Sequence, residues 1–214
     1  MSFLFWKRTP DARAQKFWEC VSRHRLQLVR ESSETKGYKR AFDALSGSLC
    51  RYNPRLGFEL LVSAEEALSI TITAYGKIDS FDSVRRLVDA APHSRNLTVT
   101  AFRQPEGEDF SLEIAGRTVS PAKTRFEPMT GKSDPSSLGL TLFFLDGESL
   151  PRVEREFAGQ IMLQTILGEY VAATCIDHVE VQDASAEEME KYIPLAKIQE
   201  YVAWHARRHP RKTH

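Results

Sequence analysis

The sequence has only three cysteines and no apolar run that approaches the length of a membrane span. Cys20, Cys50 and Cys175 lie far apart and form no CxxC pair, which excludes a zinc ribbon or a CxxC redox site. We expect three free thiols, with Cys175 the slowest to react, as in a protein of a reducing cytosol. The apolar run Phe3–Trp6 has no basic segment before it, so we expect no secretory signal peptide and a cytoplasmic location.

The sequence also lacks the signatures of nucleotide binding and of nucleophilic catalysis. No GxGxxG, GxxxxGK or GxSxG motif occurs. Basic and acidic side chains number 29 each, so the net charge is zero and no overall field favours nucleic acid or a membrane surface. We therefore assign no catalytic residue and no metal ligand, and we expect no cofactor.

The stretch Leu56–Arg103 has the clearest secondary-structure pattern in the chain. Ser69–Tyr75 and Leu97–Phe102 alternate apolar and polar side chains, which is typical of strands with one buried face. Between them, apolar residues at helical spacing predict a helix over 81–91. With a further strand over 57–62, the order predicts a β-β-α-β unit whose helix packs on the apolar side of an antiparallel sheet.

The same periodicities divide the rest of the chain. Helices are expected over 11–31, 37–51, 149–167 and 184–191, and from Pro194 onward. Strands are expected over 110–114, 123–128, 138–145, 170–176 and 178–182, with a hairpin turn at Ala115–Arg117 and the clearest loop over 130–137. Residues 123–182 thus repeat the order of elements in 57–115 without repeating its residues.

These elements predict an α+β fold with one or two antiparallel sheets built from two β-β-α-β halves. Residues 1–52 form an N-terminal helical hairpin packed on the rest, 53–120 the first half, and 121–214 the second half with a C-terminal helix. We expect one compact unit. Two sets of side chains are expected to face its core: Leu87, Val99, Leu142, Ile161 and Ile166 as its centre, and Val153, Phe157 and Ala158 from the first half of helix 149–167.

One face of the first sheet is the best candidate binding surface. Tyr75, Thr98, Thr100 and Phe102 lie, by alternation, opposite the apolar side, next to Ser69, Thr71 and Thr73. Such a face can bind a partner or stack nucleic-acid bases. The alternative is that the N-terminal helices cover it.

Other polar residues allow weaker readings. His205 and His209 are four apart on a predicted helix, but Pro210 is expected to move His209 out of helical geometry. Arg207, Arg208, Arg211 and Lys212 form a basic tail that we expect to be frayed and solubilising rather than a nucleic-acid site. Glu169, Asp177 and Glu180 are read as exposed turn charges rather than an acid–base pair, and the excess of basic residues over 1–40 as a solvated surface.

Several short motifs occur in a fixed order over most of residues 16–182. They are KFWE (Lys16–Glu19), LGFEL (Leu56–Leu60), ITAYG (Ile72–Gly76), VDAAP (Val88–Pro92), VTAFR (Val99–Arg103), LEIAG (Leu112–Gly116), LTLF (Leu140–Phe143) and LGEY (Leu167–Tyr170). In this order they resemble a bacterial protein family known as a domain of unknown function. The resemblance implies a shared fold, carries over no catalytic residue, and does not reach the tail after Trp204.

From the sequence we expect a non-enzymatic bacterial cytosolic protein that binds a partner, most simply another protein. Two alternatives stay open: an enzyme or small-ligand-binding protein with a dispersed site, and a nucleic-acid-binding protein that uses the β-face and the basic ends. Converging carboxylates or histidines would favour the first alternative, and a continuous basic stripe would favour the second.

Overall fold

The computed structural model of the chain describes residues 11–31, 33–130, 134–145 and 150–211, and the fold is α+β, as the sequence predicts. The chain divides into two compact units, unit 1 (Met1–Phe102) and unit 2 (Arg103–His214). Residues 103–120 therefore belong to the second unit. The sequence instead predicts one compact unit, with the first half ending at residue 120. The run Phe3–Trp6, residue Lys212 and part of the 130–137 loop lie outside the described residues.

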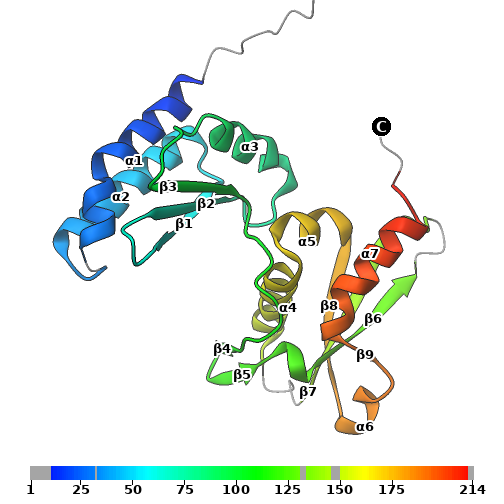
Figure 1. The fold of residues 1–214 in the computed structure, drawn as a ribbon. Helices are drawn as coiled ribbons and strands as arrows, with labels where there is room; N and C mark the ends of the chain where they lie inside the picture. The colour runs from blue at the N-terminus through cyan, green and yellow to red at the C-terminus, as the bar shows by residue number, and fades with distance from the viewer. Residues whose placement is uncertain (1–10, 32, 131–133, 146–149, 212–214) are drawn as a thin grey trace, which may run out of the picture. The chain divides into compact units, whose positions relative to one another are not determined.

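Unit 1 consists of a helical hairpin followed by a β-β-α-β unit (Figure 1). The order is α1 (Ala12–Arg30), α2 (Lys36–Tyr52), β1 (Gly57–Val62), β2 (Leu68–Thr73), the 3-10 turn η1 (Ile78–Ser80), α3 (Phe81–Asp89) and β3 (Leu97–Ala101). Asp11 accepts a hydrogen bond from the Arg13 N–H at 2.9 Å, and Thr35 accepts one from the Tyr38 N–H at 3.1 Å. These side chains cap the two helices at their first turns. The predicted elements of this unit are confirmed.

Unit 2 begins with a small hairpin and continues with a second β-β-α-β unit (Figure 1). The order is β4 (Leu112–Ile114), β5 (Arg117–Val119), η2 (Pro121–Lys123), β6 (Thr124–Thr130), β7 (Leu138–Leu145), α4 (Arg152–Leu167), α5 (Glu169–Cys175), β8 (His178–Ala184), α6 (Ala186–Met189), β9 (Ile193–Pro194), η4 (Leu195–Lys197) and α7 (Ile198–Arg208). Ala115 and Gly116 both have positive φ, which suits the predicted tight turn between β4 and β5.

The two larger sheets are mixed, which corrects the prediction of antiparallel sheets, and the small β4–β5 sheet is antiparallel. In unit 1, β1 and β2 are antiparallel but β2 and β3 are parallel. In unit 2, the sheet order is β8-β7-β6-β9, with β6 and β7 antiparallel and β7 and β8 parallel. A helix that crosses one face between neighbouring strands returns the chain to the same end of the sheet, so α3 and α4 each impose a parallel pair. The predicted β-β-α-β order recurs in unit 2, with one further helix, α5, between α4 and β8.

The segment 170–176 is a helix, α5, and the prediction of a strand there is wrong. Gly168 has φ 78° and ends α4, and the next residue starts α5. A glycine with positive φ turns the chain at no steric cost. The following residues include two adjacent alanines, which favour a helix over a strand. The strand β8 then covers the second predicted segment, 178–182.

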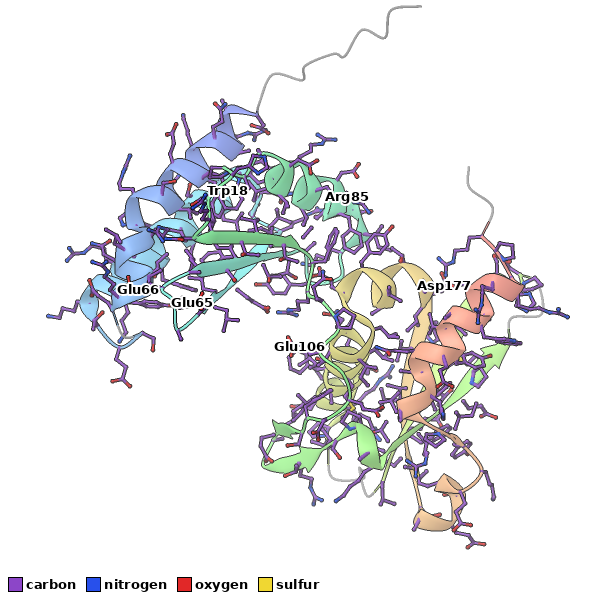
Figure 2. The ribbon with its side chains drawn as sticks, viewed as in Figure 1. Trp18, Glu65, Glu66, Arg85, Glu106 and Asp177 are labelled. Carbon is purple, nitrogen blue, oxygen red and sulfur yellow. The ribbon has the colours of Figure 1, made fainter. Side chains whose placement is uncertain are left out.

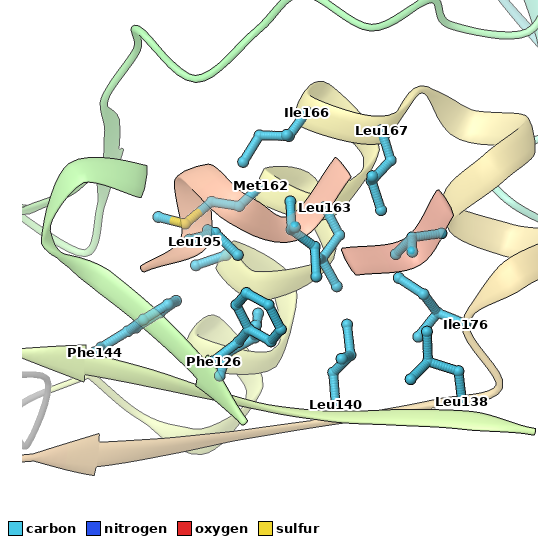
Figure 3. Packing of buried hydrophobic residues seen from close by; sticks show 14 of the residues in the cluster. Phe126, Leu138, Leu140, Phe144, Met162, Leu163, Ile166, Leu167, Ile176 and Leu195 are labelled. Carbon is cyan, nitrogen blue, oxygen red and sulfur yellow. The ribbon is translucent and has the colours of Figure 1, made fainter. Parts of the chain in front are cut away.

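The core of unit 2 lies between α4, α7 and the sheet (Figure 3). Its largest members come from β6, β7, α4 and the start of η4: Phe126, Leu138, Leu140, Leu142, Phe144, Met162, Leu163, Ile166 and Leu195. The predicted burial of Leu87, Leu142 and Ile166 is confirmed. Val99 and Ile161 are only partly buried, so their assignment to the fully buried core is wrong.

Helix α4 presents a different face to the sheet from the one predicted. Val153 and Phe157 are 74% and 56% exposed, whereas Ala158 is fully buried. A Cβ added at Gly159 would lie only 2.8 Å from Val181 Cγ2, so the helix axis approaches the sheet at this glycine. The close approach fixes the rotation of α4 and leaves the earlier apolar residues outside the core.

Candidate binding sites

Three helices cover one face of the unit 1 sheet. Trp18 of α1 donates from Nε1 to the Leu87 carbonyl oxygen of α3 at 2.8 Å, and Tyr52 of α2 donates to the Ser83 carbonyl oxygen at 3.0 Å. These bonds join α1, α2 and α3 over the face that holds the buried apolar side chains of β2 (Figure 1; Trp18 is labelled in Figure 2). The helices therefore do not cover the opposite, predicted binding face.

The opposite face is polar and partly exposed. The parallel register pairs Ser69 with Thr98 and Thr71 with Thr100, so these four predicted side chains are brought together, whereas Thr73 is fully buried. On the other side of β2, the antiparallel register places β1 residues of the same parity beside them. The side chains of this open face are Glu59, Leu61, Ser69, Thr71, Thr98 and Thr100.

The two aromatic residues predicted at the end of this face have different positions. Tyr75 is 50% exposed, and a Cβ at Gly57 would collide with its ring, so the ring lies against the backbone of β1 at one end of the open face. Phe102 is 6% exposed and packs on Phe81 of α3, with ring centroids 4.5 Å apart. Phe102 has φ 64°, which breaks the strand alternation and turns its side chain toward the helix. The placement of Phe102 on the open face is therefore wrong.

Strand β1 is an outer strand of this sheet, and its outer edge has unpaired backbone groups. The Ser63 N–H donates to the Ala67 carbonyl oxygen, which marks that pair as hydrogen-bonded across the β1–β2 hairpin. Hydrogen-bonded pairs alternate with non-bonded ones in an antiparallel ladder. The N–H and C=O groups of Phe58, Leu60 and Val62 therefore point away from β2, and no other strand of the described residues pairs with them.

A groove of about 560 Å³ lies between the first half of α1 and the end of α2. It is lined by Arg13, Lys16, Glu19, Cys20, Arg23, Ser48, Arg51 and Tyr52. The sequence interpretation missed this groove. The only sequence feature that pointed to the groove was the excess of basic residues over 1–40. That excess does not predict that four cations line the same side of the helix pair.

A smaller cavity of about 170 Å³ lies in unit 2 beside the end of α7. It is lined by residues of α7 and of β6, β7 and the segment between them: Tyr201, Trp204, His205, His209, Pro128, Met129, Pro135, Ser137 and Leu138. His209 stays next to His205, with ring centroids 5.1 Å apart, because its N–H still bonds to the His205 carbonyl oxygen at 2.8 Å. Helix α7 ends at Arg208, and His209 has φ −131° and ψ 70°, so His209 lies outside helical geometry, as the following Pro210 predicts. Burial, followed by the neighbouring His209, lowers the pKa of His205.

The basic tail is ordered further than predicted. Arg207 and Arg208 are exposed, but Arg211 donates to Asp177 Oδ2 at 2.6 Å and to the Cys175 carbonyl oxygen at 3.2 Å (Asp177 is labelled in Figure 2). Asp177 also accepts from the Leu138 N–H at 2.8 Å. The chain through Arg211 is thus part of the unit 2 fold, and the prediction of a frayed end does not hold for it.

The three carboxylates considered for acid–base chemistry have separate roles. Glu169 is fully buried, not an exposed turn charge, and accepts a hydrogen bond from the Arg103 N–H at 3.2 Å. Asp177 binds Arg211, and Glu180 lies 3.3 Å from His178 at the surface. They form no acid–base pair with one another. Among the described residues no group of three or more His, Cys, Asp and Glu side chains is arranged to hold a metal ion.

Comparison with known proteins gave no match: no family model, curated protein or solved structure aligns significantly with the chain. The resemblance drawn from the short motifs therefore stays a prediction. Within the described residues, no helix is both long and apolar enough to cross a membrane.

Proposed function

We propose that this is a non-enzymatic bacterial cytosolic protein that binds an extended segment of a partner protein along the outer edge of β1. The observation that carries the proposal is the row of outward backbone groups of Phe58, Leu60 and Val62, next to the exposed side chain of Leu61. An unpaired, partly apolar edge of this kind is a template for a further strand. The three free cysteines support a reducing compartment.

Unit 2 provides an internal comparison. Its strand β6 occupies the position that β1 has in unit 1, and β9 pairs with the outer edge of β6 through Arg125–Pro194 and Phe126–Ile193. The chain therefore closes the equivalent edge in one unit, and no described segment closes it in the other. This difference supports a role for the β1 edge in recognition.

The chemistry of the surface favours a protein segment over nucleic acid. Glu59 is the charged side chain among the residues that form the open face, and none of those residues is a lysine or an arginine. Such a face neutralises no phosphate. Leu61 is 71% exposed and Val62 38%, so a partner strand with alternating apolar side chains has apolar surface to cover on both faces.

The test is a selection of random linear peptides on the wild-type protein, followed by binding assays on two variants. Leu60→Pro removes an outward N–H group and leaves the ladder to β2 intact, because the Leu60 N–H does not bond to β2. Leu60→Ala is the matched control, since it removes most of the same side chain and keeps the N–H. Circular dichroism checks that both variants fold.

We expect selected peptides with alternating apolar residues that bind the wild type and Leu60→Ala but not Leu60→Pro. Amide hydrogen exchange at Phe58, Leu60 and Val62 should slow when such a peptide is bound. Enrichment of no peptide, or equal binding to Leu60→Pro and the wild type, would contradict the proposal.

A further inference from the structure

The groove between α1 and α2 combines a charged rim with a less exposed floor. The α1 side chains that line the groove include those at positions 13, 16, 20 and 23, a spacing that places them on one side of the helix. This side lies next to the buried stripe that includes Phe17 and Val21. The helical hairpin brings this side of α1 beside the last turn of α2. Tyr52 and Ser48 are 8% and 6% exposed, and they form the floor with the half-buried Cys20.

The charges of the rim are strongly unbalanced. Arg13, Lys16, Arg23 and Arg51 face the groove with Glu19 as the single acidic lining residue, so four positive charges and one negative charge give a net of +3. Arg13 lies 3.9 Å from Asp11, which is a loose and exposed contact. In the part of the chain that the structure describes, no carboxylate forms an ion pair with Lys16, Arg23 or Arg51.

The charged side chains around the groove act on the residues of its floor. Burial raises the pKa of the Cys20 thiol, and the charges of Arg23 and Arg51 oppose that shift. Burial, followed by the negative charge of Asp11, also raises the pKa of Tyr52, and the charges of Arg86 and Arg13 oppose that shift. Cations of both α1 and α2 thus act on the Cys20 side of the floor, whereas Tyr52 is also close enough to Asp11 for that carboxylate to act on it.

We propose that this groove binds a small molecule that carries two or more phosphate groups. Its volume, about 560 Å³, lies within the range of small-molecule sites. Three of the four cations are arginines, whose planar guanidinium groups bind phosphate oxygens in pairs. A di- or triphosphate supplies the charge that the groove lacks.

Nucleic acid is the less suitable ligand for this surface. The cations are confined to one groove, whereas a duplex needs a basic stripe that follows its backbone. The whole chain has no net positive charge that would support such binding. A duplex oligonucleotide is therefore the competing ligand in the test.

The experiment is a calorimetric titration of the full chain with inorganic pyrophosphate, with ATP and with a duplex oligonucleotide, at salt concentrations of about 50 mM and 200 mM. The groove variant is Arg23→Gln/Arg51→Gln. The matched control is Lys39→Gln/Arg40→Gln, which removes the same charge from exposed positions of α2 that do not line the groove. All four positions are exposed, so the substitutions should not disturb the core.

We expect the wild type and the control to bind pyrophosphate and ATP, and the groove variant to bind them about tenfold more weakly or worse. A second readout uses the thiols. Bound ATP should slow alkylation of Cys20 in the groove but not of the exposed Cys50, measured for each cysteine by mass spectrometry. Leu60→Pro should leave ATP binding unchanged, so this result is independent of the proposed partner site at β1.

Three results would overturn the proposal. They are the absence of pyrophosphate and ATP binding up to about 1 mM, an equal loss in the groove variant and the control, and tighter binding of the duplex than of ATP. The second result would indicate a general charge effect, and the third a nucleic-acid surface.

Discussion

Gly47 of α2 and Gly159 of α4 are both interior helix residues, and substitution by alanine should change the stability of their units in opposite directions. A Cβ at Gly47 would meet only Arg51 Nη1, at 3.6 Å, which is an ordinary contact distance. A Cβ at Gly159 would lie 2.8 Å from Val181 Cγ2 and 3.1 Å from Leu142 Cδ1.

The magnitudes follow from two opposing effects. Replacing an interior helix glycine by alanine raises stability by about 0.5–1 kcal/mol, because alanine loses less backbone entropy on folding. At Gly47 this is the whole effect, so Gly47→Ala should stabilise α2 by about that amount. At Gly159 overpacking costs about 1–3 kcal/mol, since Leu142 is fully buried and has no room to move. The net result of Gly159→Ala is then a loss of up to about 2.5 kcal/mol.

Native-state hydrogen exchange is the suitable assay, because the two glycines lie in different compact units and a single unfolding curve combines both. Protection of α2 should increase in Gly47→Ala, and protection of α4 should decrease in Gly159→Ala. Unchanged or increased protection of α4 in Gly159→Ala would show that α4 does not approach the sheet as closely as described.

Other substitutions and conditions test the core, the histidine pair and the thiols. Leu142→Ala should cost about 2–5 kcal/mol in denaturant unfolding, whereas Leu61→Ala, at a 71% exposed position, should stay within about 0.5 kcal/mol. Because burial lowers the pKa of His205 below its usual 6.5, the unfolded state binds more protons as the pH falls through 6.5, and stability should fall with it. His205→Asn should flatten that part of the stability–pH curve. Mass spectrometry should find no disulfide, and Cys50, the exposed cysteine, should react first with a thiol reagent.

Much of the secondary structure could be predicted because burial within an element leaves a period in the sequence. Strand β7 has the predicted bounds, Leu138–Leu145, and α1 and α2 match their predicted ranges within about one residue. The predictions failed where the decisive contact is made by another element. Gly159 fixes the rotation of α4 through Val181, and that contact is invisible in the pattern of α4 itself.

The candidate sites were harder to predict than the fold. The threonine face was found because strand alternation places Thr98 and Thr100 on one side. Phe102 was misplaced because a positive φ at the end of β3 interrupts that alternation. The α1–α2 groove was missed because it depends on which sides of two helices meet, and periodicity identifies only the side that is buried.

The partner edge shows most directly why a binding surface is harder to read than a core. The central strand β7 has neighbours on both edges and is apolar on both faces, and its sequence, LGLTLFFL, records this. The outer strand β1, GFELLV, differs mainly by the charge of Glu59 on its open face, which is typical of an edge strand. That charge indicates that solvent reaches the strand, but it does not indicate whether another segment of the chain pairs with its outer side. In unit 2 the two-residue strand β9 pairs with β6, and the sequence of β6 contains no pattern that predicts this pairing. Whether the edge of a strand is paired depends on the other segments of the fold and not on the strand's own sequence. An unpaired edge can therefore be identified only from the arrangement of the whole sheet.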